Sequence, residues 1–342
     1  MLESLLSRLA TLGSKLPEAE RVRIAAAWTR TAAGMIPDTE GLHPIANTDR
    51  KDRTADVIFV HGLGGGAHGT WQNGKAGFFW PQELGNELPH CGVWSLGYEA
   101  GMVPWFGADG LPIEDRAVNL GHKLTTRNLG DRPIVFIAHS MGGLMVKEIV
   151  VQSLTAGDPA LSTLVSRIAG IVFCGTPHRG SQVALMARRL SAVLRTQQHI
   201  RDMAAGERHL DRMHSRFVEW HRKAQPLTEA YTEGLGMKRC LWWLRWLPRL
   251  LIVEPGAADP QLAGCRCIPC HDDHIDLVKP PNREHDVYAG VLKFVRAALE
   301  SVPHSAPARL AGGVSQPNSN PSVIRSLIID ILREEGLLPP RS

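Results

Sequence analysis

The sequence predicts an α/β protein in which a mostly parallel central sheet is covered by helices on both faces. Short apolar runs alternate along the chain with longer segments whose apolar residues follow helical spacing, the order expected when helices join parallel strands. The clearest runs are apolar almost throughout, instead of alternating with polar residues: Asp56–Val60, Ile134–Ala138 and Ile168–Cys174. Strands of that kind are buried on both faces, as they are in parallel sheets.

Residues 1–54 are expected to form a helical extension followed by a connector. Apolar residues recur at helical spacing in its first part, with a break at Gly13–Pro17, and predict two helices. Residues 37–54 are polar and rich in turn-forming residues, which is typical of a connector.

The main domain is predicted to cover residues 55–300. Within it, residues 182–240 are rich in Arg and His and interrupt the strand pattern after the sixth strand. We expect a lid-like helical insertion there, although a solvated basic helical hairpin fits the same composition. Residues 301–322 have the Pro, Ser, Gly and Asn content of a linker, and residues 323–342 carry the apolar spacing of an amphipathic helix.

A serine lies at the junction of a predicted strand and helix, in the segment PIVFIAHSMGGL that ends at Leu144. When a strand turns this sharply into a helix, the serine is strained and its hydroxyl projects from the sheet, so small residues must flank it. Here Ala138 and Gly142 do so. The amides at the start of the next helix suit a tetrahedral oxyanion. The pattern favours Ser140 as a nucleophile over a merely structural turn.

The glycine-rich loop His61–Gly66 follows another predicted strand directly. Its spacing matches no phosphate-binding motif. A His-Gly loop after a strand can instead supply an oxyanion-hole amide, so we expect the Leu63 amide to act beside that of Met141. A flexible glycine turn is the alternative. His61 and Gly62 are expected to line the pocket.

The general base and its acid are expected near the end of the main domain. His274 lies between the last predicted strand and the last helix, where a general base is expected. His178 is its rival, but the base should follow the acid in the chain. A predicted strand at Arg249–Val253 leads directly into Glu254, whereas Asp259 lies further on in a loop. A rigid carboxylate orients an imidazole best, so Glu254 is favoured and Asp259 remains the alternative.

Two further histidines, His139 and His178, are expected to line the same pocket.

Cysteines and overall charge limit the other classes of function. The six cysteines are expected to be reduced thiols in a cytoplasmic protein, since no signal-peptide pattern is seen. Those from Cys265 to Cys270 match no standard zinc spacing and fall where the last strand is expected, so we expect no metal and no cofactor. A net charge of +4, without a basic helix interleaved with aromatics, argues against nucleic-acid binding.

Membrane contact is expected to be peripheral at most. No apolar run is long enough to span a bilayer. The tryptophan cluster Leu241–Leu247 fits core packing better than a membrane interface, because large aromatics dominate protein cores.

Five sequence blocks occur in order along the chain: FVHGLGG, TW, IAHSMGGL, FCGTPHRGS and DHIDLVKP. Together they resemble the lipase-like α/β-hydrolases of the serine-active-site-containing protein and GPI inositol-deacylase type. The resemblance covers residues 55–298. It implies the α/β-hydrolase fold, a hydrophobic acyl or lipid substrate, an oxyanion hole of Leu63 and Met141, and a catalytic triad of Ser140, Glu254 and His274.

The leading hypothesis is therefore a serine esterase that cleaves carboxylic esters, such as those of lipids, through an acyl-enzyme. A thioesterase or peptidase could use the same groups, because the sequence does not fix the leaving group. A third hypothesis is a hydrolase-like scaffold whose terminal helices recruit a protein partner. The intact nucleophile, base and oxyanion glycines argue against that scaffold.

Overall fold

A computed structural model describes residues 40–100, 113–194, 203–237 and 251–301. The chain divides into a unit of residues 1–302 and a second unit of residues 303–342, and all described residues belong to the first. The two predicted N-terminal helices, the tryptophan cluster and the C-terminal helix lie outside the described residues, as does nearly all of the predicted linker.

The described residues form a seven-stranded sheet in the order β1-β5-β2-β6-β7-β8-β9. All neighbouring strands are parallel except β1, which pairs antiparallel with β5. A small separate hairpin joins Gln72–Asn73 (β3) to Phe78–Phe79 (β4). The strands of the main sheet are β1 (Gly41–Ala46), β2 (Ala55–Val60), β5 (Cys91–Gly97), β6 (Ile134–His139), β7 (Ile168–Cys174), β8 (Leu227–Glu233) and β9 (Arg266–Cys270).

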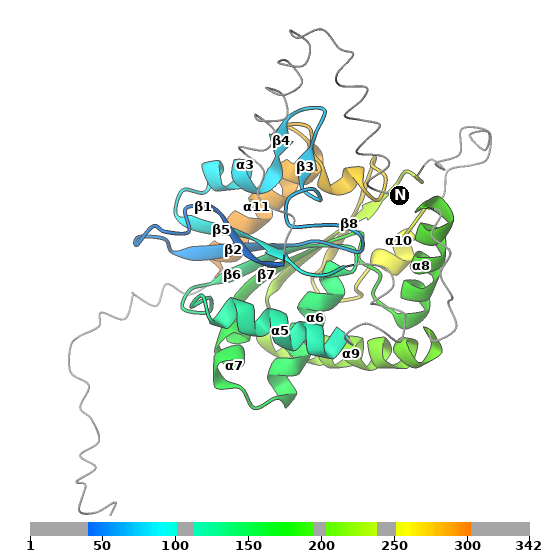
Figure 1. Ribbon diagram of the computed structural model, residues 1–342, viewed down its shortest axis with the longest axis horizontal. Helices are drawn as coiled ribbons and strands as arrows, with labels where there is room; N and C mark the ends of the chain where they lie inside the picture. Colours follow the sequence, from blue (N-terminus) through cyan, green and yellow to red (C-terminus); the bar gives the residue numbers. More distant parts are fainter. Residues whose placement is uncertain (1–39, 101–112, 195–202, 238–250, 302–342) are drawn as a thin grey trace, which may run out of the picture. The chain divides into compact units, whose positions relative to one another are not determined.

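Helices cover both faces of this sheet (Figure 1). Helices α3 and α11 pack on one face, and α5, α6, α7, α8 and α9 contribute to the core on the other. Every residue of β2, β6 and β7 is buried, which explains their continuous apolar runs and confirms the predicted fold class. The helices are α3 (Trp80–Glu87), α5 (Ile113–Thr125), α6 (Gly142–Thr155), α7 (Pro159–Ser166), α8 (Gly180–Leu194), α9 (Met203–Ala224), α10 (Pro255–Ala258), the 3₁₀ helix η2 (Asp276–Val278) and α11 (Asp286–Glu300).

Strand β1 lies in the segment 37–54 that the sequence predicts to be a connector. It forms one edge of the sheet, and its register with β5 shifts between Pro44 and Ala46. Only Leu42 and Ala46 in it are buried, so most of its side chains can be polar. A half-buried edge strand that contains proline resembles a connector in composition.

Strand β8 lies inside the segment 182–240 that the sequence predicts to be helical. It pairs parallel with both β7 and β9, so the helical insertion between strands is limited to α8 and α9. The strand predicted at Arg249–Val253 is wrong in its described part, because residues 251–253 form no strand and Ile252 and Val253 lie in a bend. The strand that precedes β9 in the sheet therefore ends at Glu233 rather than beside Glu254.

Candidate active site

Ser140 occupies the sharp turn between β6 and α6. Its φ is +52°, a conformation that residues other than glycine rarely adopt and that typically costs about 1–3 kcal/mol. The Ser140 amide donates to the carbonyl oxygen of Cys174 on β7 at 2.8 Å, which anchors the turn to the sheet. Glycine is required beside it, because a Cβ on Gly142 would overlap the carbonyl oxygens of Val60 and His61.

The Ser140 hydroxyl faces a histidine from a distant part of the chain. His274 Nε2 lies 3.1 Å from Ser140 Oγ, within hydrogen-bonding distance. His274 belongs to the loop between β9 and η2, and both residues are only 2% exposed. The fold thus brings together the two residues that the sequence predicts as nucleophile and base.

The carboxylate next to His274 is Glu233, the last residue of β8. Its Oε1 lies 3.3 Å from His274 Nδ1, and the side chain is completely buried. The two atoms are close without forming a well-aligned hydrogen bond. Such loose geometry is common for catalytic groups, whose hydrogen bonds tighten in reaction complexes. The amide of Val253 also donates to Glu233 Oε1 and holds the carboxylate in place.

The predicted acids Glu254 and Asp259 are not at this position, which corrects the sequence-based assignment. The Glu254 side chain is 55% exposed and pairs with Arg189 Nη2 of α8 at 2.5 Å. Asp259 Oδ1 accepts the amide of Gln261 at 2.8 Å. The carboxylate beside His274 does end a strand, as the sequence-based rule expects, but that strand is β8, whose polar sequence LTEAYTE carries no apolar pattern.

The Leu63 and Met141 amides, predicted to form the oxyanion hole, belong to peptide groups whose carbonyl oxygens are those of Gly62 and Ser140. Hydrogen bonds to these two carbonyl oxygens hold the peptide groups in place. The Gly62 carbonyl lies 3.0 Å from His61 Nδ1 and also accepts the Gly65 amide at 3.1 Å. The Ser140 carbonyl accepts the Gly143 amide at 3.1 Å. In a trans peptide the N–H points opposite to the carbonyl, so these bonds fix the directions of the Leu63 and Met141 amides.

His61 is itself held by Tyr98 on the loop after β5. The Tyr98 amide lies 3.3 Å from His61 Nε2, so Nε2 accepts and Nδ1 carries the proton that goes to Gly62. The two rings stack with centroids 4.3 Å apart, and the Tyr98 hydroxyl donates to the His61 carbonyl at 2.6 Å. The glycine-rich loop also packs against Ser140, since a Cβ on Gly62 would lie 2.7 Å from Ser140 Cβ.

His178, the rival for the general base, belongs to a different buried cluster. Its Nδ1 lies 2.5 Å from the ammonium nitrogen of Lys147, which is also 3.1 Å from His214 Nδ1. Burial lowers the pKa of Lys147 and of His178, and lowers that of His214 to about 3. These contacts account for His178, so His274 and not His178 is the histidine at Ser140.

Helix α8 covers Ser140. Met186 of this helix is fully buried, and its Sδ lies 3.5 Å from Ser140 Oγ. The sequence places the insertion in the right region but does not identify Met186, because a single methionine on a helix carries no distinguishing signal.

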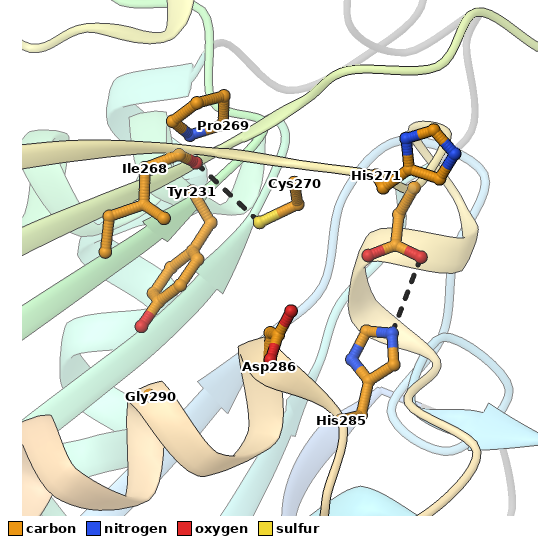
Figure 2. A pocket seen from close by; sticks show the side chains of 9 residues that line it. Tyr231, Ile268, Pro269, Cys270, His271, His285, Asp286 and Gly290 are labelled. Atoms are coloured by element: carbon orange, nitrogen blue, oxygen red, sulfur yellow. Dashed lines mark hydrogen bonds and ion pairs between the residues drawn. The ribbon is translucent and has the colours of Figure 1, made fainter.

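Bonds to the side chain of Asp273 hold the turn that carries His274. Asp273 Oδ1 accepts the amides of Ile275 and Asp276 at 3.0 Å each. Beside its start lies a cavity of about 460 Å³ whose lining residues include Tyr231, Cys270 and His285 (Figure 2). There Asp272 Oδ1 lies 3.5 Å from His285 Nε2 and raises the pKa of His285.

Within the described ranges, no group of three or more His, Cys, Asp or Glu residues could hold a metal ion. None of the described helices is long and apolar enough to cross a membrane.

A parallel sheet with a strained serine at a strand–helix turn, facing a histidine from a later loop, defines a hydrolase of the α/β class. A model of the alpha/beta hydrolase family matches residues 57–310. The chain belongs to that family.

The chain is also similar to Protein SERAC1 of Homo sapiens, with 27% identity over 279 residues, covering 75% of this chain and 41% of that protein. The Danio rerio protein of the same name is 26% identical over 281 residues, with the same coverage. The chain thus spans about two fifths of the length of these relatives. Among solved structures, a carboxylesterase of Nitrososphaera gargenis is 12% identical with a TM-score of 0.45, covering 76% of this chain and 95% of that one.

Proposed function

We propose that this protein is a serine esterase that cleaves carboxylic esters of hydrophobic acyl groups, such as those of lipids, through an acyl-enzyme. Ser140 is the nucleophile, His274 the general base and Glu233 the acid that orients it. The observation that carries this proposal is the chain of contacts from Ser140 Oγ to His274 Nε2 at 3.1 Å and from His274 Nδ1 to Glu233 Oε1 at 3.3 Å. That order of groups is the one a serine hydrolase needs.

Each group has a defined part in the reaction. A serine hydroxyl is a poor nucleophile at its own pKa, so His274 takes its proton as Oγ attacks the acyl carbonyl. The resulting imidazolium is stabilised by the buried Glu233 carboxylate, and it then protonates the leaving alcohol. Water, activated by His274 in the same way, releases the acyl group from Ser140 and restores the enzyme.

The Leu63 and Met141 amides are proposed to stabilise the oxyanion. Their peptide groups are already fixed by hydrogen bonds at the Gly62 and Ser140 carbonyls, so no reorganisation is needed when charge develops. In a comparable protease, removing one such donor costs about 3–4 kcal/mol of transition-state stabilisation. Because both donors are backbone groups, this contribution depends on the conformations of the glycine-rich loop and of the turn between β6 and α6, and not on the side chains of Leu63 and Met141.

The buried surroundings of the nucleophile support an apolar acyl group. Met186 and Met141 are apolar and buried beside Ser140, and Ser140 is only 2% exposed. An ester with a hydrophobic acyl chain can replace these contacts at little cost, whereas a charged acyl group would have to be desolvated. We further propose that α8 acts as a lid that moves Met186 away from Ser140 when substrate enters. Peripheral membrane contact and a protein partner for the terminal helices remain proposals.

The test is labelling with a fluorophosphonate probe together with hydrolysis of a series of p-nitrophenyl esters of increasing chain length. We expect wild-type protein to be labelled and to prefer medium or long acyl chains over acetate. Ser140→Ala should abolish both labelling and turnover, a loss on the order of 10⁴-fold or more, with the thermal unfolding midpoint little changed. Wild-type turnover in this variant would overturn the assignment, and a faster reaction with matched acyl thioesters would point to a thioesterase instead.

A further inference from the structure

We propose that His139 is a positioning residue that locks the general-base loop to the nucleophile turn, an inference that rests on the proposed esterase function. His139 is the last residue of β6 and directly precedes Ser140. Its Nε2 lies 2.9 Å from the backbone carbonyl oxygen of His274, and the residue is only 8% exposed. A carbonyl oxygen can only accept, so Nε2 carries the proton and donates it.

This bond and the contact between His274 and Ser140 tie the same two segments together at two points. The side chain of His139 holds the backbone of His274, while the side chain of His274 contacts the hydroxyl of Ser140 at 3.1 Å. Since His139 and Ser140 are adjacent in the chain, the two contacts act with the Glu233 contact to fix the position and the rotation of the His274 ring. Without the contact from His139, the backbone at His274 is held less firmly and the ring can shift relative to Ser140 Oγ.

The surroundings of His139 favour its neutral form, which this role requires. Burial lowers the pKa of His139, and the nearby His274, His61 and Lys279 lower it further. The two imidazole rings lie 4.9 Å apart at an angle of 44°. When His274 becomes an imidazolium during catalysis, a neutral His139 can keep donating to its carbonyl without adding a second positive charge.

The experiment compares His139→Leu, which removes the donor, with His139→Gln, whose side-chain amide can restore it. Hydrolysis of a p-nitrophenyl ester and the rate of fluorophosphonate labelling are measured across the pH range. In His139→Leu we expect kcat and the labelling rate to fall on the order of 10- to 100-fold with little change in KM, because a small misplacement of a catalytic group has effects of that size. His139→Gln should recover most of this loss.

The acid limb of the pH–rate profile separates positioning from a structural role. If the loop loosens, Glu233 stabilises the His274 imidazolium less well, so the limb should move to lower pH in His139→Leu and stay near the wild-type value in His139→Gln. A smaller folded fraction would instead scale the whole profile without moving the limb. His221 serves as a matched control, since it is a buried histidine that does not belong to the site. Its Nε2 lies 2.9 Å from Thr228 Oγ1. His221→Leu should leave the limb in place.

Wild-type kcat in His139→Leu would overturn the proposal, as would equal losses in the leucine and glutamine variants. If His139→Leu does not fold, His139→Gln decides the matter, because it must retain near wild-type kcat and an unmoved acid limb. Failure of the esterase function itself would be distinguished by wild-type protein that is neither labelled at Ser140 nor hydrolytic.

Discussion

Strands β6 and β8 lie on either side of β7, and each leads to a residue of the active site, yet they are built from opposite kinds of side chain. β6, with the sequence IVFIAH, is apolar up to its last residue, whereas β8, with the sequence LTEAYTE, is polar at four positions. Both strands are buried, apart from Leu227 at the start of β8. The two strands therefore reach the same burial in physically different ways.

The two glutamates of β8 are each stabilised by individual partners. Glu229 accepts from the Tyr231 hydroxyl at 2.9 Å and pairs with Arg266 of β9. Glu233 accepts from the Val253 amide and lies against His274. An apolar strand gains stability from any close packing, but a buried carboxylate is tolerated only when its partners are in place. Loss of a single partner should thus affect β8 far more than β6.

The largest expected effect is that of Glu233→Gln at the end of β8. Gln is close to Glu in size and can keep the bond from Val253, but it cannot stabilise an imidazolium. We expect kcat to fall by about 10³- to 10⁴-fold, as when the acid of a serine protease is replaced by its amide. Glu254→Gln is the matched control, since this exposed carboxylate pairs with Arg189 and should cost less than about twofold. Steady-state kinetics of both variants with one ester would show the acid to be misassigned if the two losses were reversed.

This pair of glutamates also shows what the sequence could and could not predict. The run before Ser140 is apolar, so its burial, strand conformation and turn follow from local pattern alone. The position of His274 follows from its place after the last strand. Glu233 could not be found in this way, because its burial depends on His274 and Val253, which are remote in sequence. A hydrophobic pattern identifies buried segments by their apolar side chains. It does not reveal a buried polar side chain whose partners lie far away in the sequence.

The same reasoning applies to the sheet edge and to helix α8. The sequence predicts a connector where β1 lies because only Leu42 and Ala46 in that strand are buried, and half-buried edge strands carry little hydrophobic pattern. Met186 could not be identified, since its contact with Ser140 depends on how α8 packs over the sheet.

Glu229→Gln should separate stability from catalysis within β8. This carboxylate is buried like Glu233 but lies at the other end of the strand, against Tyr231 and Arg266. Removing its charge weakens both bonds, so we expect the free energy of unfolding to fall by about 1–3 kcal/mol. Turnover per folded molecule should be unchanged. Chemical denaturation measures the stability, and active-site titration of the same samples gives the turnover per folded molecule. A fall in kcat with unchanged stability would contradict a purely structural role of Glu229.

Met186 of α8 contacts Ser140, the residue that follows β6. Met186→Ala should change the selectivity for acyl groups rather than remove activity. Shortening this side chain frees space beside Ser140 Oγ, from which the sulfur lies 3.5 Å. We expect bulky acyl groups to gain several-fold in kcat/KM relative to acetate, since about 1 kcal/mol per methylene is typical for hydrophobic pockets. Leu185→Ala, at an exposed position of the same helix, is the control and should leave the ratio unchanged. An unaltered acyl preference in Met186→Ala would mean that this side chain does not border the acyl site.

The smallest expected effect concerns the pH dependence of the anchor between Asp272 and His285, at the start of the loop that carries His274. The pKa of His285 is raised above its ordinary value of 6.5, first by its bond to Asp272 and also by the charges of Asp272 and Asp286. A histidine whose pKa is raised on folding contributes stability that is fully present below the unfolded pKa and is lost as pH rises through the folded pKa. We therefore expect this contribution, about 0.5–1 kcal/mol for a partly exposed pair, to be complete below pH 6.5 and to disappear above it. His285→Asn should remove that pH-dependent part of the unfolding free energy, measured by denaturation at a series of pH values, while Glu233→Gln should leave it intact. If His285→Asn and wild type lost stability in parallel over this range, the anchor would not titrate, and the base loop would be held by its other bonds, which include those to His139 and Asp273.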